Sequence, residues 1–217
     1  MSKIKGLIFD LDGVLVSTEK NHFNAWKSIA DELNIQFNSN DNEKLKGLSR
    51  ADSLKALLKM GNKNLPHFKF KNILALKNEI YLKSIENINQ NDLLPFVLKF
   101  IQTKSKENYM LAVGSSSRNA NFILKKTRIH QYFKCIIDGN MVKNPKPDPE
   151  VFLNASIGLN LEPRECLVFE DAFSGIMAAK NGNFKVIGVG NPEIKNHCHK
   201  YVENLEEFDL LSYEKSI

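Results

Sequence analysis

Short apolar runs recur along the chain and predict the strands of a buried sheet. Each run is rich in β-branched or aromatic residues and is bounded by polar or glycine-containing turns. That pattern is typical of strands covered on both faces. The predicted strands are Ile4–Phe9, Tyr109–Val113, Cys135–Ile137, Cys166–Phe169 and Lys185–Val189.

Helical patterns lie between these runs, at Asn119–Lys126, Pro149–Ile157 and Ser174–Asn181. Strands that alternate with helices predict an α/β fold with a Rossmann-like parallel sheet. Functional groups in such a sheet gather at the carboxyl ends of its strands. Polar residues that directly follow a predicted strand are therefore the first candidates for chemistry.

The interval from Asp10 to Tyr109 breaks the alternation, because a simple βαβ unit takes only about 30 residues. Apolar residues at helical spacing fill the interval, so we predict an inserted helical cap domain over residues 17–90. The core domain then consists of residues 1–16 and 91–217, with its next helix starting near Leu93–Pro95. The linkers Leu15–Thr18 and Asn87–Leu93 are the predicted hinges. Three apolar groups define the cap helices: Phe23, Trp26, Ile29, Ala30 and Leu33; Leu54, Leu57 and Leu58; Ile73, Leu74, Ile80, Tyr81 and Ile88.

Composition is that of an ordinary soluble domain, with 42% hydrophobic and 25% charged residues over 217 positions. A chain of this size buries roughly 70% of its unfolded surface, so it needs no disulfide or zinc for stability. The longest apolar runs are far shorter than a bilayer span. Cys135, Cys166 and Cys198 are widely spaced and are expected to be reduced. With no secretory pattern at the N-terminus, we expect a cytoplasmic protein.

Basic residues exceed acidic ones, 30 to 25, which gives a net charge of +5. Nearly all the positive charge is lysine, and it is mixed with acidic residues along the whole chain. This distribution favours a solvated surface over a nucleic-acid site, although a basic field also attracts small phosphorylated substrates. We expect no nucleic-acid or membrane partner.

The first predicted strand ends in Asp10-Leu11-Asp12-Gly13. A lone pair of acids at this spacing is more often a surface or calcium-binding feature. Here an apolar run precedes the acids and places them at the mouth of a sheet, where both can point into one site if the chain turns at Gly13.

Three further strand ends carry polar groups of complementary chemistry. The strand at Tyr109–Val113 leads into Gly114–Asn119, whose hydroxyls and N–H groups precede a helix and form either an anion cradle or a plain helix cap. Lys146 stands between two prolines, in a rigid segment or an ordinary turn. Glu170 and Asp171 leave the fourth strand. Such a set is unlikely to arise by chance.

These four motifs, in this order, resemble the haloacid dehalogenase superfamily. His22, Trp26 and the segment Leu45–Leu54 extend the resemblance to the β-phosphoglucomutase family over essentially the full length. The sequence departs from the family at Ser17, where aspartate is usual, and at Asn144-Pro145, where small residues are usual. Neither departure removes a reacting group.

The resemblance implies an Mg²⁺-dependent phosphoryl transfer in the active site. Asp10 is expected to be the nucleophile that forms an aspartyl phosphate, and Asp12 the general acid and base. One Mg²⁺ per chain is expected on Asp10, the Asp12 backbone carbonyl and Asp171, with Glu170 in direct or indirect support. The expected phosphate- and sugar-binding residues are His22, Lys46, Gly47, Ser49, Arg50, Lys77, Ser115, Ser116, Ser117, Arg118, Asn119 and Lys146.

Arg50 carries the expectation of a mutase, because Ser49 and Asp52 predict a capped helix that starts at Arg50. A guanidinium there would hold a second phosphate, as a bisphosphate intermediate requires. The expected reaction interconverts β-D-glucose 1-phosphate and D-glucose 6-phosphate through β-glucose 1,6-bisphosphate, in a monomer. For Ser49 and Asp52 alone, a purely structural capping role is accepted, and for Trp26 core packing is favoured.

Two other readings remain open. A sugar-phosphate phosphatase of the same superfamily would use the same core groups, and a non-catalytic binding module would need none of them. Two weaker motifs are set aside. Gly188-Val189-Gly190 lacks the third glycine of a dinucleotide site. His197-Cys198-His199 lacks a fourth partner for zinc.

Overall fold

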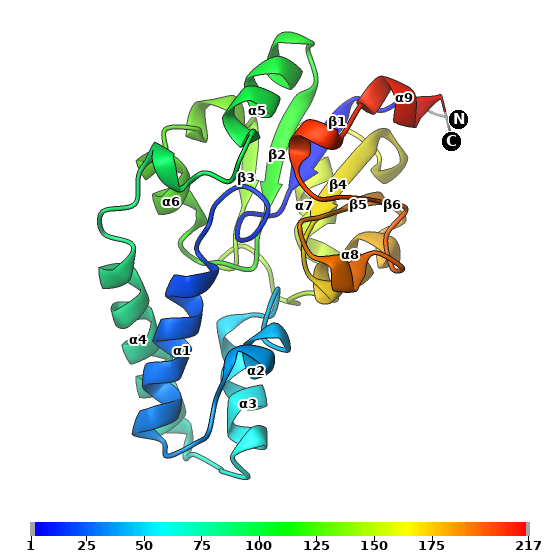
Figure 1. Cartoon of the computed structure of the whole chain (residues 1–217). Helices are drawn as coiled ribbons and strands as arrows, with labels where there is room; N and C mark the ends of the chain where they lie inside the picture. Colours follow the sequence, from blue (N-terminus) through cyan, green and yellow to red (C-terminus); the bar gives the residue numbers. More distant parts are fainter. Residues whose placement is uncertain (1–2, 216–217) are drawn as a thin grey trace.

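The computed structural model describes residues 3–215 and contains one parallel sheet with helices on both faces (Figure 1). The strand order is β3-β2-β1-β4-β5-β6, and every neighbouring pair is parallel. This confirms the predicted α/β class. The strands are β1 (Gly6–Phe9), β2 (Met110–Gly114), β3 (Cys135–Ile137), β4 (Cys166–Glu170), β5 (Lys185–Val189) and β6 (Lys200–Val202).

Strand β6 is a strand that the sequence pattern missed. It lies at the edge of the sheet against β5, and only Val202 of its three residues is buried. An edge strand with one buried side chain carries no extended apolar run, so hydrophobic periodicity does not reveal it.

Alternation along the strands divides the core into two clusters, one on each face of the sheet. Leu7 and Phe9 of β1 point to one face, where Phe9 stacks on Phe169 with ring centroids 4.8 Å apart. Ile8 and Ala112 point to the other face. Helices α5 (Val97–Lys106) and α6 (Ala120–Lys126) cover the first face, and α7 (Glu150–Leu159) and α8 (Phe173–Asn181) cover the second.

Four helices follow β1 and lie apart from the sheet (Figure 1). They enclose a hydrophobic cluster of their own, which includes Trp26, Ile29, Leu54 and Ile73. The helices are α1 (Glu19–Glu32), α2 (Ser39–Glu43), α3 (Arg50–Met60) and α4 (His67–Ser84). The remaining short elements are η1 (Gln90–Asp92), η2 (His130–Tyr132), η3 (Pro163–Glu165), η4 (Pro192–Ile194), η5 (Leu205–Glu207) and α9 (Leu210–Glu214).

The two crossings between the sheet and the helical part run side by side. Val16 forms a bridge with Leu93, and the amide of Ser17 donates to the carbonyl of Asp92 at 2.9 Å. The two connections are thereby tied to each other at the base of the helical part. Within residues 3–215, no helix is long and apolar enough to cross a lipid bilayer.

Candidate active site

The polar strand ends converge at one edge of the sheet. Asp10 follows β1, Ser115 follows β2, and Glu170 closes β4. The amide of Asp10 donates to the carbonyl of Phe169 at 2.9 Å, which continues the β1–β4 ladder by one residue and fixes the backbone of Asp10. Because the strands are parallel, their carboxyl ends share this edge.

Lys146 reaches the same edge from the segment before α7 and is almost fully buried. Its Nζ lies 2.5 Å from Oδ1 of Asp10 and 2.8 Å from Oε1 of Glu170. Burial alone would lower the pKa of Lys146, but the two carboxylates outweigh it and raise that pKa. The lysine therefore stays charged beside Asp10.

Three buried carboxylates, those of Asp10, Glu170 and Asp171, lie with their oxygens within 4.8 Å of one another. Burial raises the pKa of Asp10 to about 7 against the opposing effect of Lys146, and Glu170 adds to the rise. Burial, followed by Glu170 and Asp10, also raises the pKa of Asp171. One lysine thus does not compensate the negative charge, and a hard divalent cation fits these oxygen donors.

The two oxygens of Glu170 are already engaged. Oε1 accepts from Lys146, while Oε2 accepts from the amides of Asp171 at 2.6 Å and Ala172 at 2.9 Å. Glu170 therefore orients Lys146 and the start of the next loop. The side chains of Asp10 and Asp171 are the better placed of the three to contact a cation.

Gly13 makes the turn that folds Asp12 over this cluster. Its φ is +83°, and a Cβ there would overlap the carboxylate of Asp171. This is the turn that the sequence predicts, and only glycine fits it without strain. The carboxylate of Asp12 accepts a hydrogen bond from the Thr18 hydroxyl, and its Oδ1 lies 3.6 Å from Nε2 of His22.

Asp12 has a different environment from Asp10. Burial acts to raise the pKa of Asp12, but the neighbouring His22 and the Thr18 hydroxyl outweigh it and lower that pKa. Asp12 is therefore ionised at neutral pH, whereas Asp10 titrates near neutrality in the absence of a cation. Two acids two residues apart thus have separate chemical properties.

A buried lysine stands behind His22. Nζ of Lys77 lies 3.0 Å from Nδ1 of His22 and sits over the rings of Trp26 and Tyr81. Burial, followed by the charge of Arg50, lowers the pKa of Lys77 to about 7. Burial and Lys77 also lower the pKa of His22, so the ring is neutral. With Nδ1 accepting from Lys77, the remaining ring proton is on Nε2, the nitrogen that faces Asp12.

Arg50 lies at the first turn of α3, as the sequence predicts. The hydroxyl of Ser49 accepts from the amide of Asp52 at 3.2 Å and caps the helix. The spacing of Ser49 and Asp52 is that of a capping box, but only the Ser49 half forms, because the Asp52 carboxylate accepts from the Ser49 hydroxyl at 2.6 Å and not from the Ser49 amide. Nη2 of Arg50 donates to Oδ1 of Asn78 at 2.7 Å, and Nδ2 of Asn119 donates to the same oxygen at 3.1 Å.

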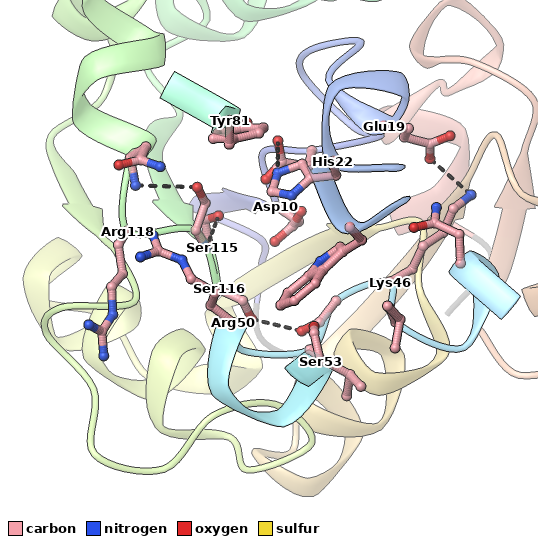
Figure 2. A pocket seen from close by; sticks show the side chains of 18 of the residues that line it. Asp10, Glu19, His22, Lys46, Arg50, Ser53, Tyr81, Ser115, Ser116 and Arg118 are labelled. Atoms are coloured by element: carbon pink, nitrogen blue, oxygen red, sulfur yellow. Dashed lines mark hydrogen bonds and ion pairs between the residues drawn. The ribbon is translucent and has the colours of Figure 1, made fainter. Parts of the chain in front are cut away.

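Lys46 does not extend into the site as a free charge. Its Nζ lies 3.0 Å from Oε1 of Glu19 and 2.9 Å from Oε2 of Glu43. Figure 2 shows Lys46 and Glu19 on one side of Asp10 and His22, and Arg50, Ser115 and Ser116 on the other side. The ammonium of Lys46 is thus neutralised within the helical part.

The loop after β2 contributes hydroxyls at two depths. Ser115 is buried, and its Oγ accepts from the amide of Ser117 at 3.0 Å. The Oγ of Ser116 donates to the carbonyl of Gly47 at 2.8 Å, so that hydroxyl contacts the helical part. Arg118 is exposed and lies at the rim. The predicted residues that line one common cavity are Asp10, Asp12, His22, Lys46, Gly47, Arg50, Lys77, Ser115, Ser116, Ser117, Arg118, Asn119 and Asp171.

Several residues of the site were not predicted from the sequence. Thr18, Glu19, Glu43 and Asn78 contact predicted site residues. Thr18 ends the segment after β1 that begins at Asp10, whereas the other three belong to no strand-end motif. Asn78 follows Lys77 directly in α4, and its position next to a predicted site residue is the one local signal that marks it. The partners of Lys46 become apparent only in the folded chain.

Comparison with known proteins agrees with this geometry. The family described as haloacid dehalogenase-like hydrolase matches residues 7–189. A β-phosphoglucomutase of Bacillus subtilis is 38% identical over 86% of this chain and 84% of its own length. A phosphorylated carbohydrates phosphatase of Thermotoga maritima is 30% identical over 85% of this chain and 84% of its own.

A solved structure of a β-phosphoglucomutase from Clostridium difficile superposes with a TM-score of 0.93 at 34% identity. It covers 98% of this chain and 96% of its own. The family match extends over most of the chain and includes Asp10, Lys146 and Asp171. The protein therefore belongs to the haloacid dehalogenase-like hydrolase family.

Proposed function

We propose that the protein is a β-phosphoglucomutase that interconverts β-D-glucose 1-phosphate and D-glucose 6-phosphate through β-glucose 1,6-bisphosphate. The observation that carries this proposal is one cavity that Asp10, Asp12 and Ser115 line from the sheet domain and Arg50 lines from α3. Lys146 and Ser115 stand beside Asp10, and Arg50 stands at the first turn of α3. A bisphosphate that exchanges its ends between half-reactions needs two such places.

Asp10 is the proposed nucleophile. Its carboxylate oxygen attacks phosphorus of the bisphosphate, the bond to the sugar oxygen breaks, and an aspartyl phosphate and a sugar monophosphate result. Lys146 holds Asp10 at 2.5 Å and is placed to neutralise the oxygens of the transferring group, with Ser115 as a further donor.

Asp10, Asp171 and the main-chain carbonyl of Asp12 are the proposed Mg²⁺ ligands, and Glu170 supports them through Lys146 and the Asp171 amide. The cation supplies positive charge next to the nucleophile and the phosphoryl oxygens, which otherwise repel each other. The raised pKa values of Asp10 and Asp171 express the same need for a cation.

Asp12 is the proposed general acid and base. In its ionised form it accepts the proton of the attacking sugar hydroxyl, and it returns a proton to the leaving sugar oxygen in the opposite half-reaction. His22 faces Asp12 with its ring proton, and Lys77 fixes that tautomer from behind. The protonation state of Asp12 is thereby set by its neighbours.

The second phosphate is proposed to bind Arg50, Ser117 and Asn119, with Ser116 and Arg118 at the edge of that site. Arg50 presents a planar fork that suits two phosphate oxygens. The sugar between the phosphates then faces Lys46, Gly47 and Ser49 of the loop before α3. With Lys46 paired to two glutamates, the backbone of this loop offers the polar contacts.

We further propose that residues 17–90 act as a cap domain on a core of residues 1–16 and 91–217. The separate hydrophobic cluster of α1–α4 and the paired crossings at Val16 and Leu93 support this division. Closure of the cap would exclude water from the aspartyl phosphate. We propose a monomer that acts on sugar phosphates in the cytoplasm, with neither nucleic acid nor a membrane as a partner.

A coupled assay tests the function directly. The substrate is β-D-glucose 1-phosphate with Mg²⁺ and a bisphosphate primer, and both glucose 6-phosphate and inorganic phosphate are measured. We expect glucose 6-phosphate to form in large excess over phosphate, with Asp10→Asn inactive. Stoichiometric phosphate release without isomerisation would refute the mutase.

A sugar-phosphate phosphatase is the second candidate, favoured by the 30% identity to the Thermotoga maritima phosphatase. Such an enzyme would use Asp10, Asp12, Lys146 and Asp171 in the same way but pass the phosphoryl group to water. A panel of α- and β-hexose 1-phosphates, with both products measured, separates the two activities.

A further inference from the structure

Two serines of the sheet domain contact consecutive carbonyls of the loop between α2 and α3. The Oγ of Ser116 donates to the carbonyl of Gly47 at 2.8 Å. The Oγ of Ser174, in the first turn of α8, donates to the carbonyl of Lys46 at 3.3 Å. Residues distant in sequence thus join the helical part to the sheet at two adjacent points of one loop.

The fit between loop and core is close. Gly47 has a φ of +72°, and a Cβ there would overlap the hydroxyl of Ser174 and lie 3.0 Å from Cβ of Ala172. The backbone of the loop at Gly47 therefore rests directly on the side chains of Ala172 and Ser174 at the start of α8. Glycine is required here both by the backbone angle and by the space.

The loop is also held from the cap side. Lys46 is paired to Glu19 and Glu43, so its side chain is tied to α1 and to the end of α2 while its carbonyl faces Ser174. The side chain of Lys46 thus contacts the helical part, while the carbonyls of Lys46 and Gly47 accept hydrogen bonds from serines of the sheet domain. The contacts border the cavity, because Gly47, Ser116 and Asp171 all line it.

We infer that Ser116 and Ser174 form a two-point latch that holds the cap loop on the core and keeps water from the phosphorylated Asp10. The inference rests on the proposed mutase function and goes beyond it by assigning positioning residues for closure. With the latch closed, the phosphoryl group passes to a sugar hydroxyl. When the loop lifts, a water oxygen bonds to phosphorus, the bond to the Asp10 oxygen breaks, and the proton from water goes to Asp12.

Ser174 gives the sharper test, because it lies outside the substrate-binding residues proposed above. Loss of one part-buried hydrogen bond changes a closed-to-open ratio by about 2- to 10-fold. We therefore expect Ser174→Ala to raise the ratio of inorganic phosphate to glucose 6-phosphate by about 2- to 10-fold. Ser116→Ala combined with Ser174→Ala should raise it further, and Ser174→Thr, which keeps the hydroxyl, should restore it.

The matched control is Ser156→Ala, which removes a core hydroxyl that bonds within α7 to the carbonyl of Leu153. A merely structural role for Ser174 would shift the thermal midpoint of both variants without changing the product ratio. Hydrogen exchange of the peptide over residues 45–48 supplies a readout of the loop itself. We expect faster exchange in Ser174→Ala and wild-type exchange in Ser156→Ala.

The outcomes separate the latch from the function. Unchanged exchange in Ser174→Ala would overturn the latch, and faster exchange with an unchanged product ratio would overturn its control of water. A wild-type protein that makes phosphate alone would refute the mutase and the partition claim together. In that case the exchange measurement still decides whether the latch exists.

Discussion

Lys77 and His22 are joined inside the helical part, with Nζ of Lys77 3.0 Å from Nδ1 of His22. The other nitrogen of the same ring faces Asp12 at 3.6 Å. Lys77 thus acts on Asp12 through His22, because it determines which ring nitrogen of His22 carries the proton that faces Asp12. Lys77 therefore has an energetic cost and a chemical role, and both can be measured.

Lys77→Met should stabilise the fold and slow the enzyme. The pKa of Lys77 is about 7 in the folded protein and 10.5 when unperturbed, so the unfolded chain holds the extra proton between those values. Wild-type stability then rises with pH from about 7 to 10.5. We expect Lys77→Met to be more stable by about 1–4 kcal/mol at pH 6, with the gain shrinking toward pH 10.

Turnover of the same variant should fall by about 10- to 100-fold, because His22 loses the donor that fixes its tautomer. Denaturant unfolding at several pH values and the coupled assay check the two effects. Lys59→Met, at an exposed position of α3, serves as the control. A Lys77→Met variant that is less stable at pH 6 would contradict the burial argument.

Asp12→Asn should slow both half-reactions by about 100- to 10,000-fold, the usual range for loss of a general acid and base. The amide cannot accept the sugar hydroxyl proton, while the carboxylates of Asp10 and Asp171 remain. Calorimetric titration with Mg²⁺ should therefore give nearly wild-type affinity. A large loss of Mg²⁺ binding would show instead that the Asp12 side chain belongs to the cation site.

Arg50→Lys should harm the mutase more than simple hydrolysis. A lysine keeps the charge at the start of α3 but loses the planar fork, so mutase kcat/KM should fall about 10- to 100-fold. Hydrolysis of a small phosphate ester, which has no second phosphate, should change little. Lys55→Gln on the same helix is the control, and equal losses in both reactions would argue against a second phosphate at Arg50.

Mg²⁺ should stabilise the protein more at pH 8 than at pH 5.5. The folded pKa of Asp10 is about 7 against 3.8 when unperturbed, so the metal-free folded state binds more protons between those values. Metal-free stability therefore falls as pH rises through this window, by up to about 4 kcal/mol. A cation on the carboxylates removes this loss.

Thermal unfolding with Mg²⁺ or with a chelator measures the difference at each pH. The Mg²⁺ effect should nearly vanish in Asp171→Asn and persist in Asp31→Asn, which alters only a surface ion pair. A stabilisation that is equal at both pH values would exclude these carboxylates as its origin.

The sequence predicts those elements whose residue pattern lies within a short stretch of the chain. The five longer or buried strand runs were recognisable because they are apolar, and the turn at Gly13 because two acids follow one of them. β6 was missed since an edge strand buries one residue. The helical insert was evident from its length and periodicity, while the first turn of α3 followed from Ser49.

Contacts between segments that are distant in the sequence could not be predicted from such patterns. Nothing near Lys46 in the sequence indicates that Glu19 neutralises its charge. Nothing near Ser174 indicates that its hydroxyl donates a hydrogen bond to the carbonyl of Lys46, 128 positions away. The lowered pKa of Lys77 depends on burial among separate helices and on the charge of Arg50. Such features appear only once tertiary packing is known.

The side-chain oxygen of Asn78 accepts the hydrogen bonds that the oxygen of a bound phosphate could otherwise accept. It accepts from Arg50 and from Asn119 at once, so two donors from opposite parts of the molecule are already aligned before any sugar phosphate arrives. At the second-phosphate site proposed above, an incoming phosphate would replace Asn78 as the acceptor and would gain only the difference between the two sets of hydrogen bonds. If that site binds the second phosphate, Asn78 lowers the affinity for it and so favours release of an intermediate that must leave, rotate and bind again.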